Sequence, residues 1–285
     1  MRNKIRLLFV SLLVVMILGS CKKELLKADD SQPMYILPQG DHAFDQYIVD
    51  FHQKYGTYIL YKFNDADFRW DFTRNIPFVG TAGDPERVAA SLTFLKDEFF
   101  GFYAEDLFKK MVPYKIMLCK KITPLEPSSE VPLAGLADAV WSQSHIAFGH
   151  VDKRWDDFSE QQKKQAKGAI HGAFWAAAAA GNKIQIAPDF IEGIPYSYLH
   201  ENNYKMYGVF AVPTNQYKDL YEYISRITSH TKAELEEKFF TPKFDPTGVY
   251  QRKYNDLISF YKINYKIDLQ AIGDAKLHEL LKKNN

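Results

Sequence analysis

The chain has 285 residues, of which 46% are hydrophobic and 25% charged, which is enough for one sizeable core or two small ones. Its formal net charge is +1. Arg2, Lys4 and Arg6 are three of the 36 basic residues and residues 1–20 contain no acid, so 33 basic residues face 35 acidic ones beyond residue 20. This near-neutral balance gives no electrostatic case for nucleic-acid binding, which needs a clustered basic surface, and we expect no nucleic-acid partner.

Residues 1–20 predict a lipoprotein signal peptide. A basic start is followed by the apolar run 7–18, which is too short to span a bilayer comfortably. The run ends in Leu18-Gly19-Ser20-Cys21, which resembles the lipobox cut by the lipoprotein signal peptidase, and the Cys21 thiol would then carry the lipid. Several acyl chains on one cysteine give stable anchoring. We therefore expect a protein lipid-anchored to a membrane of the cell envelope through Cys21.

The polar residues 21–39 predict a flexible tether, and residues 40–285 a single domain with an α/β part to about residue 181 and a helical part over 182–285. With Cys21 lipidated, Cys119 has no partner for an intrachain disulfide and is expected to be a small buried residue. Which side of the membrane the domain faces stays open.

The first half of the domain mixes helix and strand patterns. Helices are expected over 41–55, which Gly56 ends, and from Asp84-Pro85-Glu86 to about Tyr103. Strands are expected over 57–63 and 115–121, a turn over 64–67, and a proline-containing loop over 123–132. One or two strands are expected over 140–151, where His145 and His150 would point to opposite faces of a regular strand.

The strongest helix signal runs from Ser159 to Gly181. Ser159 is a suitable N-cap, alanines fill the second half, and Gly181 predicts a left-handed end. Beyond it, residues 183–187 predict a short strand or a loop, and 188–203 an irregular segment with His200 and Glu201 near its end. The rest of the chain predicts helices, over 214–230, 231–240, 249–261 and from about residue 268.

The middle of the long helix reads His171-Gly172-Ala173-Phe174-Trp175. In a helical His-Glu-x-x-His motif, two histidines four residues apart hold one Zn²⁺, and the Glu deprotonates the metal-bound water. Here His171 is the remnant ligand position, Gly172 replaces the general base, and Trp175 replaces the second ligand. The pattern predicts no catalytic residue, no metal site and no cofactor.

Several segments resemble a family of Gram-negative lipoproteins described as zinc-binding metallopeptidases, which are often encoded beside outer-membrane glycan-uptake proteins. The resembling segments are the lipoprotein leader, residues 55–72, the strand 114–122, the long helix and residues 263–283. The resemblance implies an α+β, zincin-like fold in which a small mixed sheet lies against the central helix 159–181, followed by a helical C-terminal half. It also implies a place at the outer membrane.

These observations lead to three hypotheses. The first is an extracytoplasmic metallopeptidase homologue without catalytic activity that binds a peptide, a protein or a glycan-uptake partner. The second is a zinc-dependent peptidase with substituted ligands, for instance His171 with His145, His150, His200 or Glu201. The third is a glycan-binding surface lipoprotein that uses exposed residues among its 18 Tyr and 4 Trp.

Overall fold

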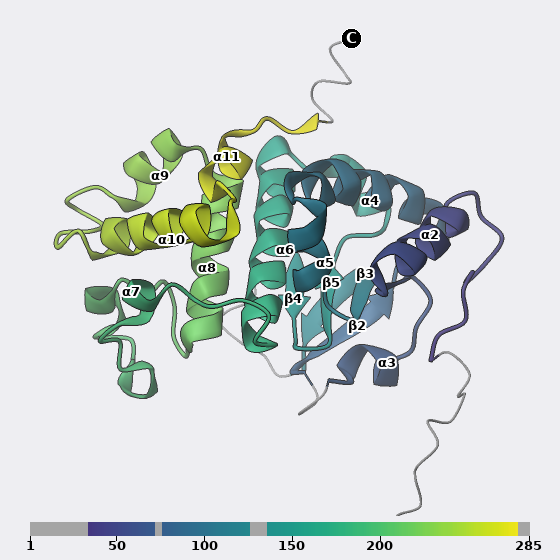
Figure 1. Cartoon of the computed structure of the whole chain (residues 1–285), viewed down its shortest axis with the longest axis horizontal. Coiled ribbons are helices and arrows are strands. Elements are labelled where there is room, and N and C mark those ends of the chain that lie inside the picture. The colour runs from purple at the N-terminus through teal and green to yellow at the C-terminus, as the bar shows by residue number, and fades with distance from the viewer. Residues whose placement is uncertain (1–33, 72–75, 126–135, 279–285) are drawn as a thin grey trace, which may run out of the picture. The chain divides into compact units, whose positions relative to one another are not determined.

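A five-stranded mixed sheet and one long helix form the centre of the fold (Figure 1). The computed structural model describes residues 34–71, 76–125 and 136–278. The predicted signal peptide and Cys21 lie outside these residues. The described residues from Leu37 onward form one compact unit.

The sheet is built around β3, Lys115–Pro124, a strand with a nearly continuous buried run. β3 pairs in parallel with β1, Tyr58–Leu60, on one side and with β5, His145–Phe148, on the other. β2, Phe78–Ala82, runs antiparallel to the second half of β3, and β4, Ala139–Trp141, runs antiparallel to β5 at the sheet edge. The small mixed sheet expected from the sequence is therefore present.

Helices of the first half pack on this sheet. They are α2 Asp45–Tyr55, α3 Asp65–Arg69, α4 Pro85–Glu98 and α5 Glu105–Met111, with a 3₁₀ turn at Phe100–Phe102. α2 ends at Gly56 in the left-handed conformation (φ 70°), as predicted. The turn predicted over 64–67 is wrong. Asn64 and Asp67 instead form a reciprocal capping box that begins α3.

The central helix, α6, spans Glu160–Ala180. Ser159 is its N-cap, as predicted, and forms a capping box with Gln162. The prediction of a left-handed Gly181 is wrong, because Gly181 has φ −82° and the left-handed residue is Asn182, with φ 56°. Every residue from Ala166 to Ala180 is buried, so this helix is enclosed by other elements over most of its length.

The second half is helical, as expected, and its described residues after β5 contain no strand. Its helices are α7 Pro188–Ile191, α8 Gln216–Ser229, α9 Lys232–Phe239, α10 Val249–Tyr265 and α11 Leu269–Asp274. 3₁₀ turns cover Lys153–Asp157, Tyr196–Tyr198 and Tyr204–Tyr207. Residues 183–187 are a loop, and the segment 188–203, expected to be irregular, holds α7 and the turn Tyr196–Tyr198.

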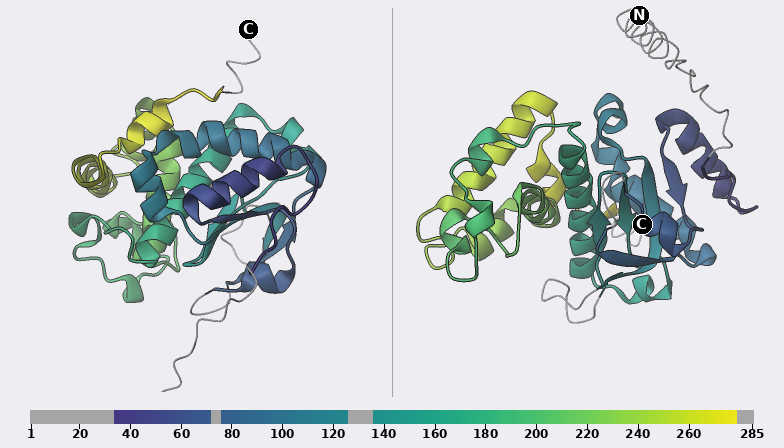
Figure 2. Two further views of the ribbon diagram at one scale, coloured as in Figure 1. Left: turned by 45° about the vertical axis from the view of Figure 1, so that its right-hand side comes forward. Right: turned by 90° about the horizontal axis from the view of Figure 1, so that it is seen from below.

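Figure 2 shows α6 as a layer between the sheet and the C-terminal helices. One face of α6 contacts β4 and β5, and another packs along α8. Within the described ranges, no helix combines the length and apolar character needed to cross a bilayer.

Candidate functional site

His171 and Trp175 share one face of α6, because residues four apart on a helix are neighbours. This face is turned towards the end of α4 and the 3₁₀ turn that follows it. His171, Trp175 and the adjoining Phe174 are completely buried, and the His171 ring packs edge-on against Phe99. The remnant ligand position therefore lies inside the core.

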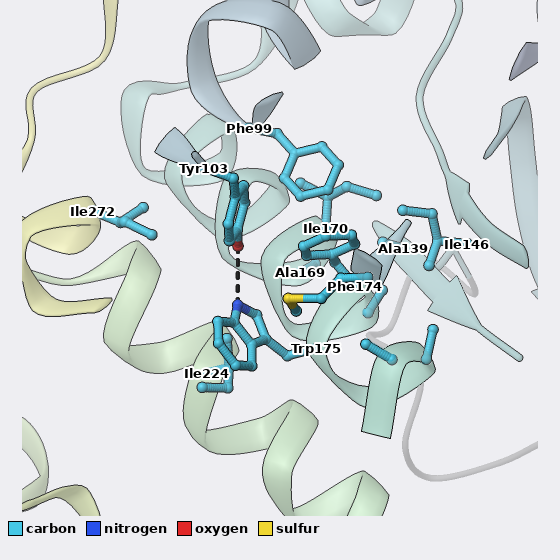
Figure 3. Packing of buried hydrophobic residues seen from close by; sticks show 14 of the residues in the cluster. Phe99, Tyr103, Ala139, Ile146, Ala169, Ile170, Phe174, Trp175, Ile224 and Ile272 are labelled. Carbon is cyan, nitrogen blue, oxygen red and sulfur yellow. Dashed lines mark hydrogen bonds between the residues drawn. The ribbon is translucent and has the colours of Figure 1, made fainter. Parts of the chain in front are cut away.

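Three hydrogen bonds join this face of α6 to α4 and its turn. The Trp175 indole N–H donates to the Tyr103 hydroxyl oxygen at 3.0 Å, as Figure 3 shows. The Tyr103 oxygen lies 2.6 Å from His171 Nδ1, and His171 Nε2 lies 2.9 Å from the Glu98 carbonyl oxygen. A carbonyl only accepts, so Nε2 carries the imidazole hydrogen and Nδ1 accepts the Tyr103 proton. The three side chains form one directional chain with all their polar atoms paired.

Burial fixes the charge of this chain. Desolvation, together with the nearby Lys167, lowers the pKa of His171 from 6.5 to about 3. Desolvation also raises the pKa of the Tyr103 hydroxyl well above its ordinary value. At neutral pH the imidazole and the phenol are both uncharged, as the hydrogen-bond directions require.

A catalytic zinc ion does not fit this arrangement. Zinc takes an unshared electron pair of neutral imidazole, usually from three protein ligands, and leaves one position for water. In His171 the Nδ1 lone pair accepts from Tyr103, and Nε2 bears the hydrogen that Glu98 accepts. Trp175 fills the place of the second ligand with an indole that offers no lone pair to a metal.

Gly172 faces α8 instead of an open cleft. A Cβ atom at residue 172 would lie 2.1 Å from Ser225 Oγ and 2.7 Å from the Tyr221 carbonyl oxygen. One turn earlier, a Cβ at Gly168 would lie 2.2 Å from the Ser225 carbonyl oxygen. The two glycines let the α6 and α8 backbones approach closely, and no side chain, least of all a carboxylate, can stand at residue 172 without moving α8.

A second polar cluster adjoins His171, and the sequence did not reveal it. The Glu98 carboxylate is fully buried, with Oε2 3.1 Å from Lys167 Nζ. Its Oε1 accepts from the His278 backbone N–H at 2.5 Å and lies 2.9 Å from His278 Nδ1. Lys167 lies one helical turn before His171, and burial lowers its pKa. The only indication of this cluster in the sequence is that Glu98 lies beside Leu95 and Phe99, which are expected to face inward.

The other histidines considered as ligands have different partners. His145 is fully buried, and its Nδ1 lies 3.0 Å from both the Ser142 and Ser144 hydroxyl oxygens. Burial and the Lys115 charge lower its pKa to about 3. His150 Nε2 lies 2.7 Å from an Asp138 carboxylate oxygen. Each imidazole is held by its own part of the sheet and its loops.

His200 and Glu201 lie in an exposed loop before the turn at Tyr204–Tyr207. The His200 backbone N–H donates to the Asn203 side chain. Within residues 34–71, 76–125 and 136–278, no group of three or more His, Cys, Asp or Glu side chains is arranged to hold a metal ion. The substituted ligand set considered from the sequence is not brought together here.

The fold and this core define an α+β protein with a metallopeptidase-like fold. No protein-family model matches the sequence, and a search of curated proteins finds no match. Among solved structures, the fold is similar to one titled "putative zinc-binding metallo-peptidase" from Bacteroides caccae ATCC 43185. The TM-score is 0.52 with 12% sequence identity, over 84% of this chain and 93% of that one.

This similarity agrees with the resemblance seen in the sequence and extends it over most of the chain. At 12% identity it establishes the shared fold. The chemistry of this chain therefore has to be argued from its own residues.

Proposed function

We propose that this chain is an envelope lipoprotein with a metallopeptidase fold that does not hydrolyse peptides and acts by binding. The observation that carries the proposal is the engagement of both His171 ring nitrogens, one by Tyr103 and one by Glu98. A histidine with no free lone pair, sealed in the core, has no means to hold a catalytic metal and its water.

The base position supports the same conclusion independently. Peptide hydrolysis by zinc needs a group that takes a proton from water. At residue 172 the α8 backbone and Ser225 leave room for a hydrogen atom only. Restoring a carboxylate would require a rearrangement of the α6–α8 packing, not the adjustment of one side chain.

The proposed location of the protein rests on the signal-peptide-like segment 1–20 and on Cys21. The lipobox-like sequence before Cys21 supports a lipid anchor, followed by a polar tether to the folded domain. On this proposal the domain works at the outer membrane, where its partner is a peptide, a protein or a component of glycan uptake.

Glycan binding is the second candidate, and one side chain favours it. Tyr198 is 79% exposed, in a segment between α7 and α8 that also presents Met206, 66% exposed. An exposed phenol ring can stack on the apolar face of a sugar. The tryptophans offer less than the hypothesis required, since Trp155 and Trp175 are buried and Trp70 and Trp141 are partly buried.

A cleavage assay tests the absence of peptidase activity. The purified protein is incubated with zinc and a peptide library, and cleavage is followed by mass spectrometry. We expect no cleavage above that of an Asn variant of His171. Cleavage that depends on zinc and on His171 would contradict the proposal.

Binding is tested in parallel by affinity electrophoresis on polysaccharides. Retardation that is lost in Tyr198→Ala but kept in Ile263→Ala, where the side chain on α10 is 66% exposed, would support the glycan candidate. Equal migration of all three proteins with and without polysaccharide would leave peptide or protein binding as the remaining form of the proposal.

A further inference from the structure

Two buried acid–lysine pairs lie in the described part of the chain, and their surroundings differ. Glu98–Lys167 joins α4 to α6, and Asp219–Lys253 joins α8 to α10. All four side chains are at most 2% exposed. Neither pair belongs to the hydrogen-bond chain of His171, although Glu98 contributes its carbonyl there.

The Asp219 carboxylate is paired on one oxygen only. Oδ2 lies 2.5 Å from Lys253 Nζ and accepts from the Tyr196 hydroxyl at 2.7 Å. Oδ1 is buried and has no hydrogen-bond partner. An ionised carboxylate shares its charge between both oxygens, so an unpartnered buried oxygen is costly for the anion and less so for the carbonyl oxygen of the neutral acid.

The lysine is equally isolated from water. The Lys253 ammonium lies 4.2 Å from the centre of the Phe190 ring and 4.9 Å from that of Tyr223. Gly208, in the left-handed conformation (φ 64°), leaves room for the lysine stem, since a Cβ there would lie 3.1 Å from Lys253 Cδ. Burial raises the pKa of Asp219 and lowers that of Lys253. Both shifts make it easier to populate the neutral acid together with the neutral amine.

We propose that Asp219 and Lys253 condense to an intramolecular amide that links α8 to α10, with the Tyr196 hydroxyl donating to the oxygen that leaves as water. The Lys253 ammonium first gives a proton to Oδ2, the oxygen that it contacts at 2.5 Å. The amine lone pair then attacks Cγ, and the carbonyl electron pair moves onto Oδ1.

Collapse of this intermediate re-forms the carbonyl at Oδ1 and breaks the Cγ–Oδ2 bond. Oδ2 takes one proton from the nitrogen and leaves as water while it accepts from the Tyr196 hydroxyl, so the products are one amide and one water molecule. The step uses no oxidant, metal or cofactor. Burial is what permits it, because both reacting groups are held in contact and away from bulk water.

Glu98–Lys167 is the internal control. Its Nζ–O distance is 3.1 Å, and the other carboxylate oxygen receives two donors from His278, whose side chain is 46% exposed. Glu98 Oε2 likewise has no hydrogen-bond partner, so what sets this pair apart is its longer contact, 3.1 Å against 2.5 Å between Lys253 Nζ and Asp219 Oδ2. We expect this pair to remain an ion pair.

The test is tryptic peptide mapping of the full-length protein. An amide at Lys253 blocks cleavage there and joins peptide 219–226 to peptide 253–262, with a mass lower than their sum by about 18 Da, the mass of water. The branched peptide is the expected result, while Glu98 and Lys167 are recovered in unlinked peptides. Recovery of free peptide 219–226 together with peptide 254–262 would overturn the proposal.

Variants extend the test. Asp219→Asn is expected to give the same branched peptide by loss of ammonia, and Lys253→Arg none. Tyr196→Phe is expected to reduce the linked fraction several-fold, and an undiminished fraction would overturn the role assigned to the phenol.

Discussion

The Tyr103 hydroxyl lies 2.6 Å from His171 Nδ1, so a tyrosine proton is held where a zinc ion would need the imidazole lone pair. The same hydroxyl accepts from Trp175, the residue that replaces the second ligand of the zinc motif. The core thus uses the retained His171 and the substituted Trp175 together, as the two ends of one chain of hydrogen-bonded side chains.

Removing this hydroxyl should be costly. Tyr103→Phe leaves the Trp175 N–H and His171 Nδ1 without partners in the core, and each buried unpaired group costs about 1–3 kcal/mol. We expect the free energy of unfolding to fall by about 2–4 kcal/mol in urea titrations. Tyr198→Phe, at a 79% exposed side chain, should change it by less than about 0.5 kcal/mol. Equal stability of the two variants would show that the chain of hydrogen bonds does not hold the core.

Gly172→Ala tests the close approach of α6 and α8. Alanine favours an isolated helix over glycine by about 1 kcal/mol, but its Cβ would lie 2.1 Å from Ser225 Oγ. We expect a net loss of stability of about 1–3 kcal/mol, as for overpacked cores. Gly181→Ala, where the nearest atom is 3.3 Å from the added Cβ, should be nearly neutral. A stabilised Gly172→Ala protein would mean that α8 does not occupy this position.

Acid should destabilise the fold through its buried histidines. Folding lowers the pKa of His171 from 6.5 to about 3, so between these values the unfolded chain binds a proton that the folded chain does not. Stability is therefore lost as the pH falls from 6.5 towards 3, by up to about 1.4 kcal/mol per pH unit. His145, whose pKa is also lowered to about 3, makes a second contribution to the loss of stability as the pH falls.

Urea titrations between pH 7 and pH 4 measure this slope. In His171→Asn the pH dependence of the free energy of unfolding should be smaller by the contribution of one proton, which is about 1.4 kcal/mol per pH unit at the acid end. His200→Asn, at a residue of an exposed loop, is the matched control for the substitution itself. Parallel slopes for wild type and the His171 variant would contradict the burial of a neutral imidazole.

Glu98→Gln tests the buried cluster beside His171. The change leaves the Lys167 ammonium without its buried counter-charge and weakens the bonds from His278. Breaking one side of a buried ion pair typically costs about 3–5 kcal/mol. Glu160→Gln, which breaks the surface pair with Lys164, should cost less than about 1 kcal/mol. The difference between the two variants is read from thermal and urea unfolding.

Local patterns predicted much of the fold. The capping signals at Ser159 and Pro85 and the apolar periodicity located the long helices, and the run around Ile116 located the central strand. Local residue preferences gave wrong predictions at two places. At Asn64 they predicted a turn, but a capping box begins a helix of five residues there. At Gly181 they predicted the left-handed conformation, which occurs one residue later. These are choices between neighbouring residues that tertiary packing decides.

The site was predictable in part. The motif showed that residues 172 and 175 could not serve zinc chemistry, but it could not show what they do instead. Tyr103 and Glu98 reach His171 across more than 65 residues of sequence, and no local pattern reports such a contact. Gly172 was identified as a missing base, whereas its role is to admit α8, which only the paired helices reveal.

Zinc binding tests the central claim most directly. The wild-type protein and His171→Asn are dialysed against zinc, then against metal-free buffer, and the metal retained per chain is measured by mass spectrometry. We predict that neither protein retains zinc above the level of a non-binding control. One zinc ion per wild-type chain, lost in the His171 variant, would contradict the account.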